Sequence, residues 1–141
     1  MTSDSTRVEF RLDRDPRLIA AVRAAVQFQA NYAGLDAASG EQFAIASEDV
    51  CREALLQLAD DGGGLEVVLR TFSDRIEIAV QHHGQLIPAV GLETFTRAGV
   101  GAGRPGALDG VELLACVDRV LFDTQNGIAC TTLVKFVQPR R

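Results

Sequence analysis

The stretch at residues 42–60, QFAIASEDVCREALLQLAD, constrains the fold of this chain more than any other. Its apolar residues recur at spacings of three and four, which predicts a helix with a broad buried face. Ser39 is expected to cap this helix, with Gln42 reaching back in a capping box. Charge interrupts the pattern at its centre, where Asp49 and Glu53 stand one turn apart and share a face. They form either a solvated stripe on a buried helix or part of a polar site.

A strand and another helix are expected before this stretch. Residues 6–12 alternate between apolar and charged side chains, which predicts a half-buried strand. Asp15 and Pro16 are typical of a helix start, and Gly34 is typical of a helix end. The apolar face of the helix between them is assigned to Leu18, Ile19, Val22, Val26 and Tyr32.

A hairpin and a long loop are expected after it. Residues 65–70 and 76–81 alternate on either side of a turn at 73–74, which predicts two paired strands. The glycine-rich residues 82–109 are expected to form a lid-like loop with a short helix at 90–97, since loops of this length in compact domains are usually functional or mobile.

The C-terminal part predicts a third helix and a second hairpin. Gly110 is expected to open the helix over VELLACVDRV, and Val120 and Phe122 belong to the strand that follows. Asn126-Gly127 favours a type I′ turn, after which residues 128–137 form the closing strand.

The predicted order of elements is β-α-α-β-β-α-β-β. This order predicts an α/β (α+β) two-layer sandwich, with a mostly antiparallel, mixed sheet and the helices on one face. The 141 residues suit one domain spanning 1–141, in which residues 1–5 are expected to be frayed.

Charge and composition exclude several classes of function. The net charge of −5 argues against a nucleic-acid-binding surface. No apolar run reaches the roughly 20 residues of a membrane span, and no apolar signal segment stands at the N-terminus, so a cytoplasmic protein is expected. The three cysteines fit neither a disulfide framework nor a zinc site. His82 and His83, adjacent in a strand, point to opposite faces and are not expected to bind one metal ion together.

Three stretches resemble motifs of a known family. The first is ASEDVCREALLQL, in the helix at 42–60. The second is IEIAVQ, followed by His82 and Gly84. The third, ALDGVELLACVDRV, contains Gly110. With the order of elements over residues 7–137, these stretches resemble the histidine-kinase-like ATPase domain (Bergerat fold), and more narrowly the bacterial anti-sigma factor and serine kinase family, which controls alternative sigma factors by partner switching.

The first motif concerns catalysis and metal binding. In the family, this helix carries a carboxylate that acts as general base and, four residues later, an asparagine that binds magnesium. The resemblance places Asp49 at the base position and Glu53 at the asparagine position. A shift by one residue would place Glu48 and Arg52 there instead.

The other two motifs are also altered. His82 stands where the family has an aspartate that hydrogen-bonds the adenine amino group, and only Gly84 remains of the two glycines that follow. Gly110 matches a glycine of the phosphate cradle at the start of the last helix. Glu112 stands where a second glycine is usual, and its carboxylate would repel phosphate. The resemblance therefore implies a relative that kept the fold and lost efficient ATP binding.

Three hypotheses follow. The first is a homodimeric regulatory protein that binds a sigma factor or its STAS-type antagonist and uses no cofactor. The second is an active serine/threonine protein kinase that phosphorylates a STAS-type antagonist, with ATP, magnesium, Asp49 as base and Glu53 as a metal ligand. The third is an unrelated α/β interaction domain that shares only the architecture.

Overall fold

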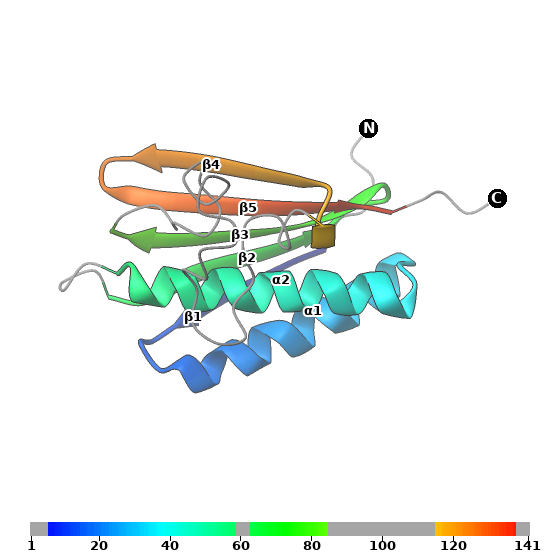
Figure 1. The fold of residues 1–141 in the computed structure, drawn as a ribbon, viewed down its shortest axis with the longest axis horizontal. Helices are drawn as coiled ribbons and strands as arrows, with labels where there is room; N and C mark the ends of the chain where they lie inside the picture. The colour runs from blue at the N-terminus through cyan, green and yellow to red at the C-terminus, as the bar shows by residue number, and fades with distance from the viewer. Residues whose placement is uncertain (1–5, 59–62, 85–114, 138–141) are drawn as a thin grey trace.

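The computed structural model describes residues 6–58, 63–84 and 115–137 (Figure 1). The described elements follow the predicted order except for the third helix. They are β1 (Thr6–Leu12), the 3₁₀ turn η1 (Pro16–Leu18), α1 (Ile19–Ala33), α2 (Ala37–Leu56), β2 (Leu65–Thr71), β3 (Arg75–His83), β4 (Arg119–Gln125) and β5 (Ile128–Phe136).

The five strands form one sheet in the order β1-β2-β3-β5-β4. Every described pairing is antiparallel, so the parallel component that a mixed sheet would require is not found among these strands. Each of the five strands lies beside a strand that precedes or follows it in sequence, and only the β3–β5 pair joins strands that are not consecutive. The pairs β2–β3 and β4–β5 are hairpins, whereas both helices lie between β1 and β2. The α/β sandwich predicted from the order of elements is confirmed.

Both helices pack against β2 and β3, α2 also contacts β5, and β4 lies at the far edge of the sheet (Figure 1). The core lies between them. Alternate residues of each inner strand point toward the helices and are buried, as the alternation of the sequence predicted. The sheet contributes Leu65, Val67, Leu69, Ile76, Ile78, Val80 and Leu133, and the helices contribute Ile19, Val22, Val26, Phe43, Ala46, Val50 and Ala54.

The start and end of α1 are as predicted. Asp15 accepts a hydrogen bond from the Arg17 backbone N–H at 3.0 Å, and Pro16 opens the η1 turn that leads into the helix. Gly34 ends α1 with φ 103°, a left-handed conformation that favours glycine. The assignments of Leu18 and Tyr32 to the buried face were wrong, because the two residues are 39% and 73% exposed.

The start of α2 differs from the prediction. The helix begins at Ala37 with Asp36 as its cap, and Asp36 Oδ1 accepts a hydrogen bond from the Ser39 N–H at 2.7 Å. Ser39 therefore lies in the first turn and does not act as the cap. Asp36 and Ser39 are both good capping residues, and the helix includes one more turn by starting at the earlier one. It ends at Leu56, short of the predicted residue 60.

The predicted third helix lies mostly outside the described residues, as do Gly110, Glu112, the short helix at 90–97 and most of the loop at 82–109. Ala115 and Cys116 are helical. The helix does not continue to Val120, because β4 already begins at Arg119. The Asp118 N–H donates to the Val134 carbonyl at 2.9 Å, so the pairing with β5 starts one residue before the strand.

The two hairpins form as predicted. Asn126 and Gly127 have φ values of 54° and 79°, which fit the predicted type I′ turn between β4 and β5. The strand β3 continues through both histidines to His83, two residues beyond the predicted end. Within residues 6–58, 63–84 and 115–137, no helix is long and apolar enough to cross a membrane.

Candidate functional site

The charged centre of α2 divides into two groups that lie on different sides of the helix. Glu48 accepts hydrogen bonds from Arg23 Nη1 in α1 at 2.9 Å and from Arg52 Nη2 at 3.2 Å. Glu48 therefore marks the side of α2 that faces α1. The ion pairs give Glu48 and Arg52 a structural role in joining the two helices.

Asp49 and Glu53 lie on the flank of α2 that is turned away from α1. Successive residues of an α-helix are rotated by about 100° around its axis, so Asp49 points about 100° away from Glu48. Glu53 is one turn further along the helix and points to the same side as Asp49. Both carboxylates are buried, with 3% of Asp49 and 9% of Glu53 exposed. The interpretation of these residues as a solvated stripe was wrong. Two buried carboxylates one turn apart form a polar site, and such residues are seldom fully buried without a partner.

The C-terminal end of β3 lies beside the C-terminal end of α2. Gly84 forms an isolated antiparallel bridge with Leu58, just beyond the last turn of the helix. Glu53 precedes Leu58 by five residues, which corresponds to about 7.5 Å along a helix axis. The fold therefore brings the Gly84 end of β3 and the Glu53 end of α2, which the resemblance assigned to one site, to the same end of the molecule.

The two histidines of β3 point to opposite faces of the sheet, as predicted. His82 follows the buried positions Ile76, Ile78 and Val80, and only 1% of it is exposed, on the face that carries the helices. His83 is exposed. Successive side chains of a strand point to opposite faces of the sheet, so the sheet lies between the His82 and His83 rings.

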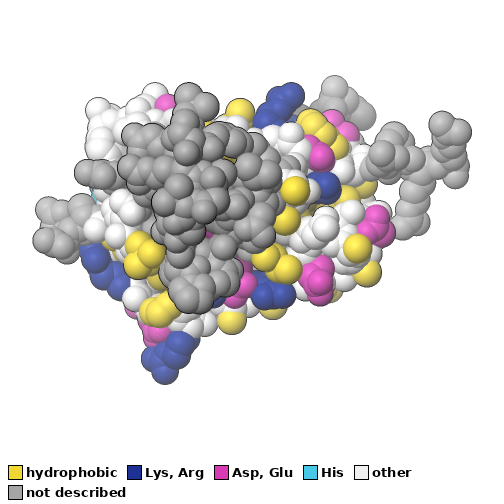
Figure 2. All heavy atoms as spheres, viewed as in Figure 1, with side chains coloured by type: hydrophobic (Ala, Val, Ile, Leu, Met, Phe, Trp, Pro, Cys, Tyr) yellow, Lys and Arg dark blue, Asp and Glu magenta, His cyan; other side chains and the backbone are white. Residues whose placement is uncertain are grey.

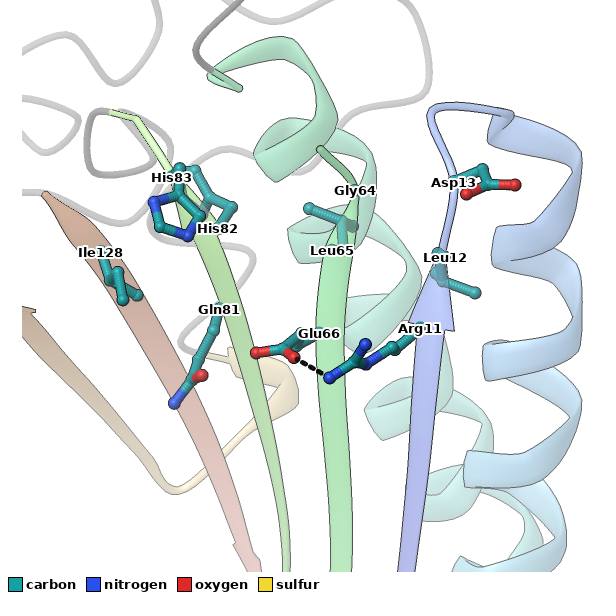
Figure 3. A pocket seen from close by; sticks show the side chains of 10 residues that line it. All are labelled: Arg11, Leu12, Asp13, Gly64, Leu65, Glu66, Gln81, His82, His83 and Ile128. Carbon is teal, nitrogen blue, oxygen red and sulfur yellow. Dashed lines mark ion pairs between the residues drawn. The ribbon is translucent and has the colours of Figure 1, made fainter. Parts of the chain in front are cut away.

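A cavity of about 290 Å³ lies at this end of the sheet (Figure 3). Arg11, Glu66 and Gln81 lie side by side across β1, β2 and β3, and Arg11 Nη2 is 3.3 Å from Glu66 Oε1. The remaining lining residues are Leu12, Asp13, Gly64, Leu65, His82, His83 and Ile128. Arg11, Glu66, Gln81, His83 and Ile128 line the cavity from the outer face of the sheet, and Leu12, Leu65 and His82 belong to the helix-facing side.

Sequence reasoning missed Thr131 as a candidate. Thr131 pairs with Val80 across β3 and β5, is fully buried on the helix-facing side, and its Oγ1 has no hydrogen-bond partner within the described residues. A buried hydroxyl without a partner is uncommon. The signal in the sequence was a polar residue at an inward position of β5, between the buried Ala129 and Leu133.

No metal centre is formed by the described residues. Across 6–58, 63–84 and 115–137, no group of three or more His, Cys, Asp or Glu side chains could hold a metal ion. If magnesium binds, the chemistry of the donor set assigns it to the oxygen atoms of Asp49 and Glu53, which are hard ligands of the kind magnesium prefers.

The electrostatic surroundings of α2 also affect a cysteine. Cys51 is completely buried, and burial, together with the nearby negative charge of Glu48, raises the pKa of its thiol to about 12. A thiol with such a pKa is not a nucleophile at neutral pH.

Over the part of the surface visible in Figure 2, acidic and basic side chains are interspersed among the described residues. This face offers no basic area for a nucleic-acid backbone.

Comparisons with protein-family models and with curated proteins found no match to this chain.

Proposed function

We propose that this protein is a regulatory binding protein of the anti-sigma type, which holds a sigma factor or a STAS-type antagonist and has lost efficient binding of ATP. The proposal joins the resemblance of three sequence stretches to a five-stranded antiparallel sheet with two helices on one face. A homodimer and a cytoplasmic location belong to the same proposal.

The observation that carries the proposal is the placement of His82. If the resemblance holds, this position requires a carboxylate that accepts a hydrogen bond from the adenine amino group. His82 is almost completely buried on the helix-facing side of β3. An imidazole there has at most one acceptor nitrogen and a different geometry from a carboxylate, so it does not replace the aspartate.

The composition of the α2 flank supports the same conclusion. Glu53 stands where the family has an asparagine, so the two buried positions carry two carboxylates rather than one. The second negative charge is unfavourable for the phosphates of a nucleotide unless a cation lies between them.

Isothermal titration with Mg-ATP tests the loss of nucleotide binding. We expect no measurable heat of binding at micromolar protein concentrations. The matched comparison is the double variant His82→Asp/Glu53→Asn, which restores both family residues, with circular dichroism to confirm that it folds. Micromolar affinity of the unmodified protein for Mg-ATP would overturn the proposed loss.

Partner binding requires a separate measurement. Purified sigma factors and STAS-type proteins from the same cell would be titrated against the immobilised protein. We expect one sigma factor or one antagonist to bind saturably and the others not to bind. If none of them binds, the anti-sigma proposal fails even where the nucleotide result agrees with it.

An active kinase is the second candidate, because Asp49 is a buried carboxylate on the flank of α2 that the resemblance assigns to the general base. The test is transfer of labelled phosphate from ATP to a STAS-type antagonist. A kinase would lose transfer in Asp49→Asn and keep it in Glu48→Gln, because Glu48 is engaged in ion pairs with Arg23 and Arg52. No transfer to any antagonist would exclude this candidate.

A further inference from the structure

The outer edge of β4 has the properties of an interface. Within the described residues, β4 pairs only with β5, so one side of its backbone has no strand beside it. Six of its seven residues are exposed. Leu121 on one face of the sheet and Phe122 on the other are 49% and 41% exposed. An exposed edge strand with apolar side chains on both faces is a template for pairing with another strand.

The backbone groups of Val120 and Phe122 point toward this open edge. The two-residue turn at Asn126-Gly127 makes Gln125 and Ile128 a hydrogen-bonded pair, and such pairs alternate along an antiparallel ladder. Every second residue of β4, counted from Gln125, therefore turns its N–H and C=O groups toward β5. The groups of the residues between them are directed outward.

The sequence of β4 is complementary to itself when two copies run antiparallel. If a two-fold axis passes through Leu121, each Leu121 faces its own copy and Val120 faces Phe122. Arg119 then faces Asp123 at both ends of the contact. The outward backbone groups of Val120 and Phe122 meet as a hydrogen-bonded pair, which agrees with the direction that the β4–β5 ladder gives them.

Other registers lose this complementarity. An axis at Asp123 would place two carboxylates opposite each other, and an axis at Val120 would place each Arg119 opposite Leu121. Since opposite charges across a strand pair stabilise it and like charges destabilise it, the register with its axis at Leu121 is selected. Within the described part of the chain, neither Asp123 nor Arg119 forms an ion pair, and the Arg119 Cζ atom lies over the ring of Phe136, 5.8 Å from its centroid.

The other edge strand, β1, is a poorer interface. Its apolar residues face the core, and its outward face carries Arg7, Glu9 and Arg11. These charges already have partners, since Arg7 pairs with Glu9 at 2.8 Å and Arg11 with Glu66 at 3.3 Å. Charged side chains that alternate along an edge are a common protection against edge-to-edge pairing. The two edges of the sheet therefore differ in what they can accept.

We propose that two copies of this chain pair through the outer edges of β4, antiparallel and with the two-fold axis at Leu121, to form one continuous ten-stranded sheet. The inference is argued from the residues of β4, and it rests on the proposed function only for the homodimer, to which it assigns an interface. A contact of this length buries less than the ~1,200 Å² of a standard interface, so the dimer forms in a concentration-dependent equilibrium.

Sedimentation velocity over a range of concentrations tests the proposal on the full chain. We expect the unmodified protein to convert from monomer to dimer as its concentration rises. Leu121→Lys places two like charges at the axis and should weaken the dimer at least about tenfold. Glu9→Arg on β1 is the matched control and should leave the equilibrium unchanged.

Exchange of charges tests the register. Arg119→Asp alone creates two Asp–Asp contacts, and Asp123→Arg alone creates two Arg–Arg contacts, so each variant should be monomeric. An equimolar mixture of the two should form a heterodimer, because each contact then joins Asp to Arg. Circular dichroism and thermal melting verify that all variants fold.

The proposal is overturned by a monomer at all concentrations, by a dimer that persists in Leu121→Lys, or by a dimer that only Glu9→Arg disrupts. A mixture of the two charge variants that stays monomeric would overturn the register. A monomer at all concentrations would also overturn the homodimer of the proposed function. None of these outcomes depends on nucleotide or sigma-factor binding, so failure here is distinguishable from failure of the nucleotide and partner tests.

Discussion

Arg23 in α1 donates from Nη1 to Oε1 of Glu48 in α2 at 2.9 Å, which joins the two packed helices. Arg52 approaches the other carboxylate oxygen at 3.2 Å. The Glu48 side chain is 17% exposed, so these ion pairs are less screened than those on an open surface. These ion pairs give Glu48 and Arg52 a structural role, so the presence of this pair of charged residues at the centre of α2 requires no catalytic explanation.

Glu48→Gln should therefore lower the free energy of unfolding by about 1 kcal/mol, because it removes the charge that pairs with both arginines. Urea denaturation followed by circular dichroism measures the change. Glu41→Gln is the matched control, since Glu41 is an exposed residue of the same helix. Equal stability of the two variants would show that the interhelical pair contributes nothing.

The aromatic residues of the helices allow a test of the core. Phe43 in α2 is fully buried between the helices and the sheet, whereas Phe28 in α1 is 66% exposed. Phe43→Ala should cost about 3–5 kcal/mol, a large part of the ~5–15 kcal/mol that stabilises a typical domain. Phe28→Ala should change stability by less than about 0.5 kcal/mol. Similar losses in both variants, measured by urea denaturation, would contradict the assignment of the core.

A glycine at the start of β2 allows a test of the sheet end that borders the cavity. A Cβ atom on Gly64 would lie 1.8 Å from the Leu12 carbonyl oxygen, so the backbone of β1 or β2 must move to admit it. Gly64→Ala should cost about 2–3 kcal/mol. Gly127 has φ +79°, and no atom lies within 4 Å of the position of its Cβ. Gly127→Ala should therefore cost only about 1 kcal/mol, from the unfavourable backbone conformation alone. Thermal melting of both variants measures the difference, and a reversed order would contradict this geometry.

The sequence was sufficient to predict the strands and their inward faces. The alternation in residues 6–12, 65–71 and 75–83 corresponds to a strand with one face on a core, and the turns between strands follow from residues with restricted conformations. The helix ends were less predictable. Asp36 and Ser39 both suit the capping position, and the choice between them depends on packing of the first turn and not on local preference.

The candidate site was predictable in composition but not in burial. The pattern identified Asp49 and Glu53 as unusual, but their burial depends on what lies against one flank of α2, which a single helix does not encode. The opposite error was made for Tyr32, whose spacing fits the apolar face of α1 although no element among the described residues buries its side chain. Thr131 escaped notice because threonine is common in strands whether it faces inward or outward.

Cys51 provides the last prediction, since its thiol differs sharply from that of Cys130. Cys51 is completely buried in α2, and burial raises its pKa from the ordinary value of 9.0 to about 12. Cys130 in β5 is only partly buried and lies 3.9 Å from Thr132 Oγ1. Iodoacetamide reacts with the thiolate, so a short pulse near pH 8 should label Cys130 and leave Cys51 unmodified, as measured by mass spectrometry of the digested protein.

The same pKa gives a dependence of stability on pH. Because the pKa of Cys51 is higher in the folded state than in the unfolded state, its contribution to stability is complete below pH 9.0 and is lost progressively as the pH rises toward about 12. Cys51→Ala should remove this loss. Above pH 9.0, the melting temperature of the unmodified protein should therefore fall more steeply with pH than that of the variant. In urea both cysteines should be labelled at similar rates. Rapid labelling of Cys51 in the folded protein, or a melting difference that does not change with pH, would contradict the burial of this thiol.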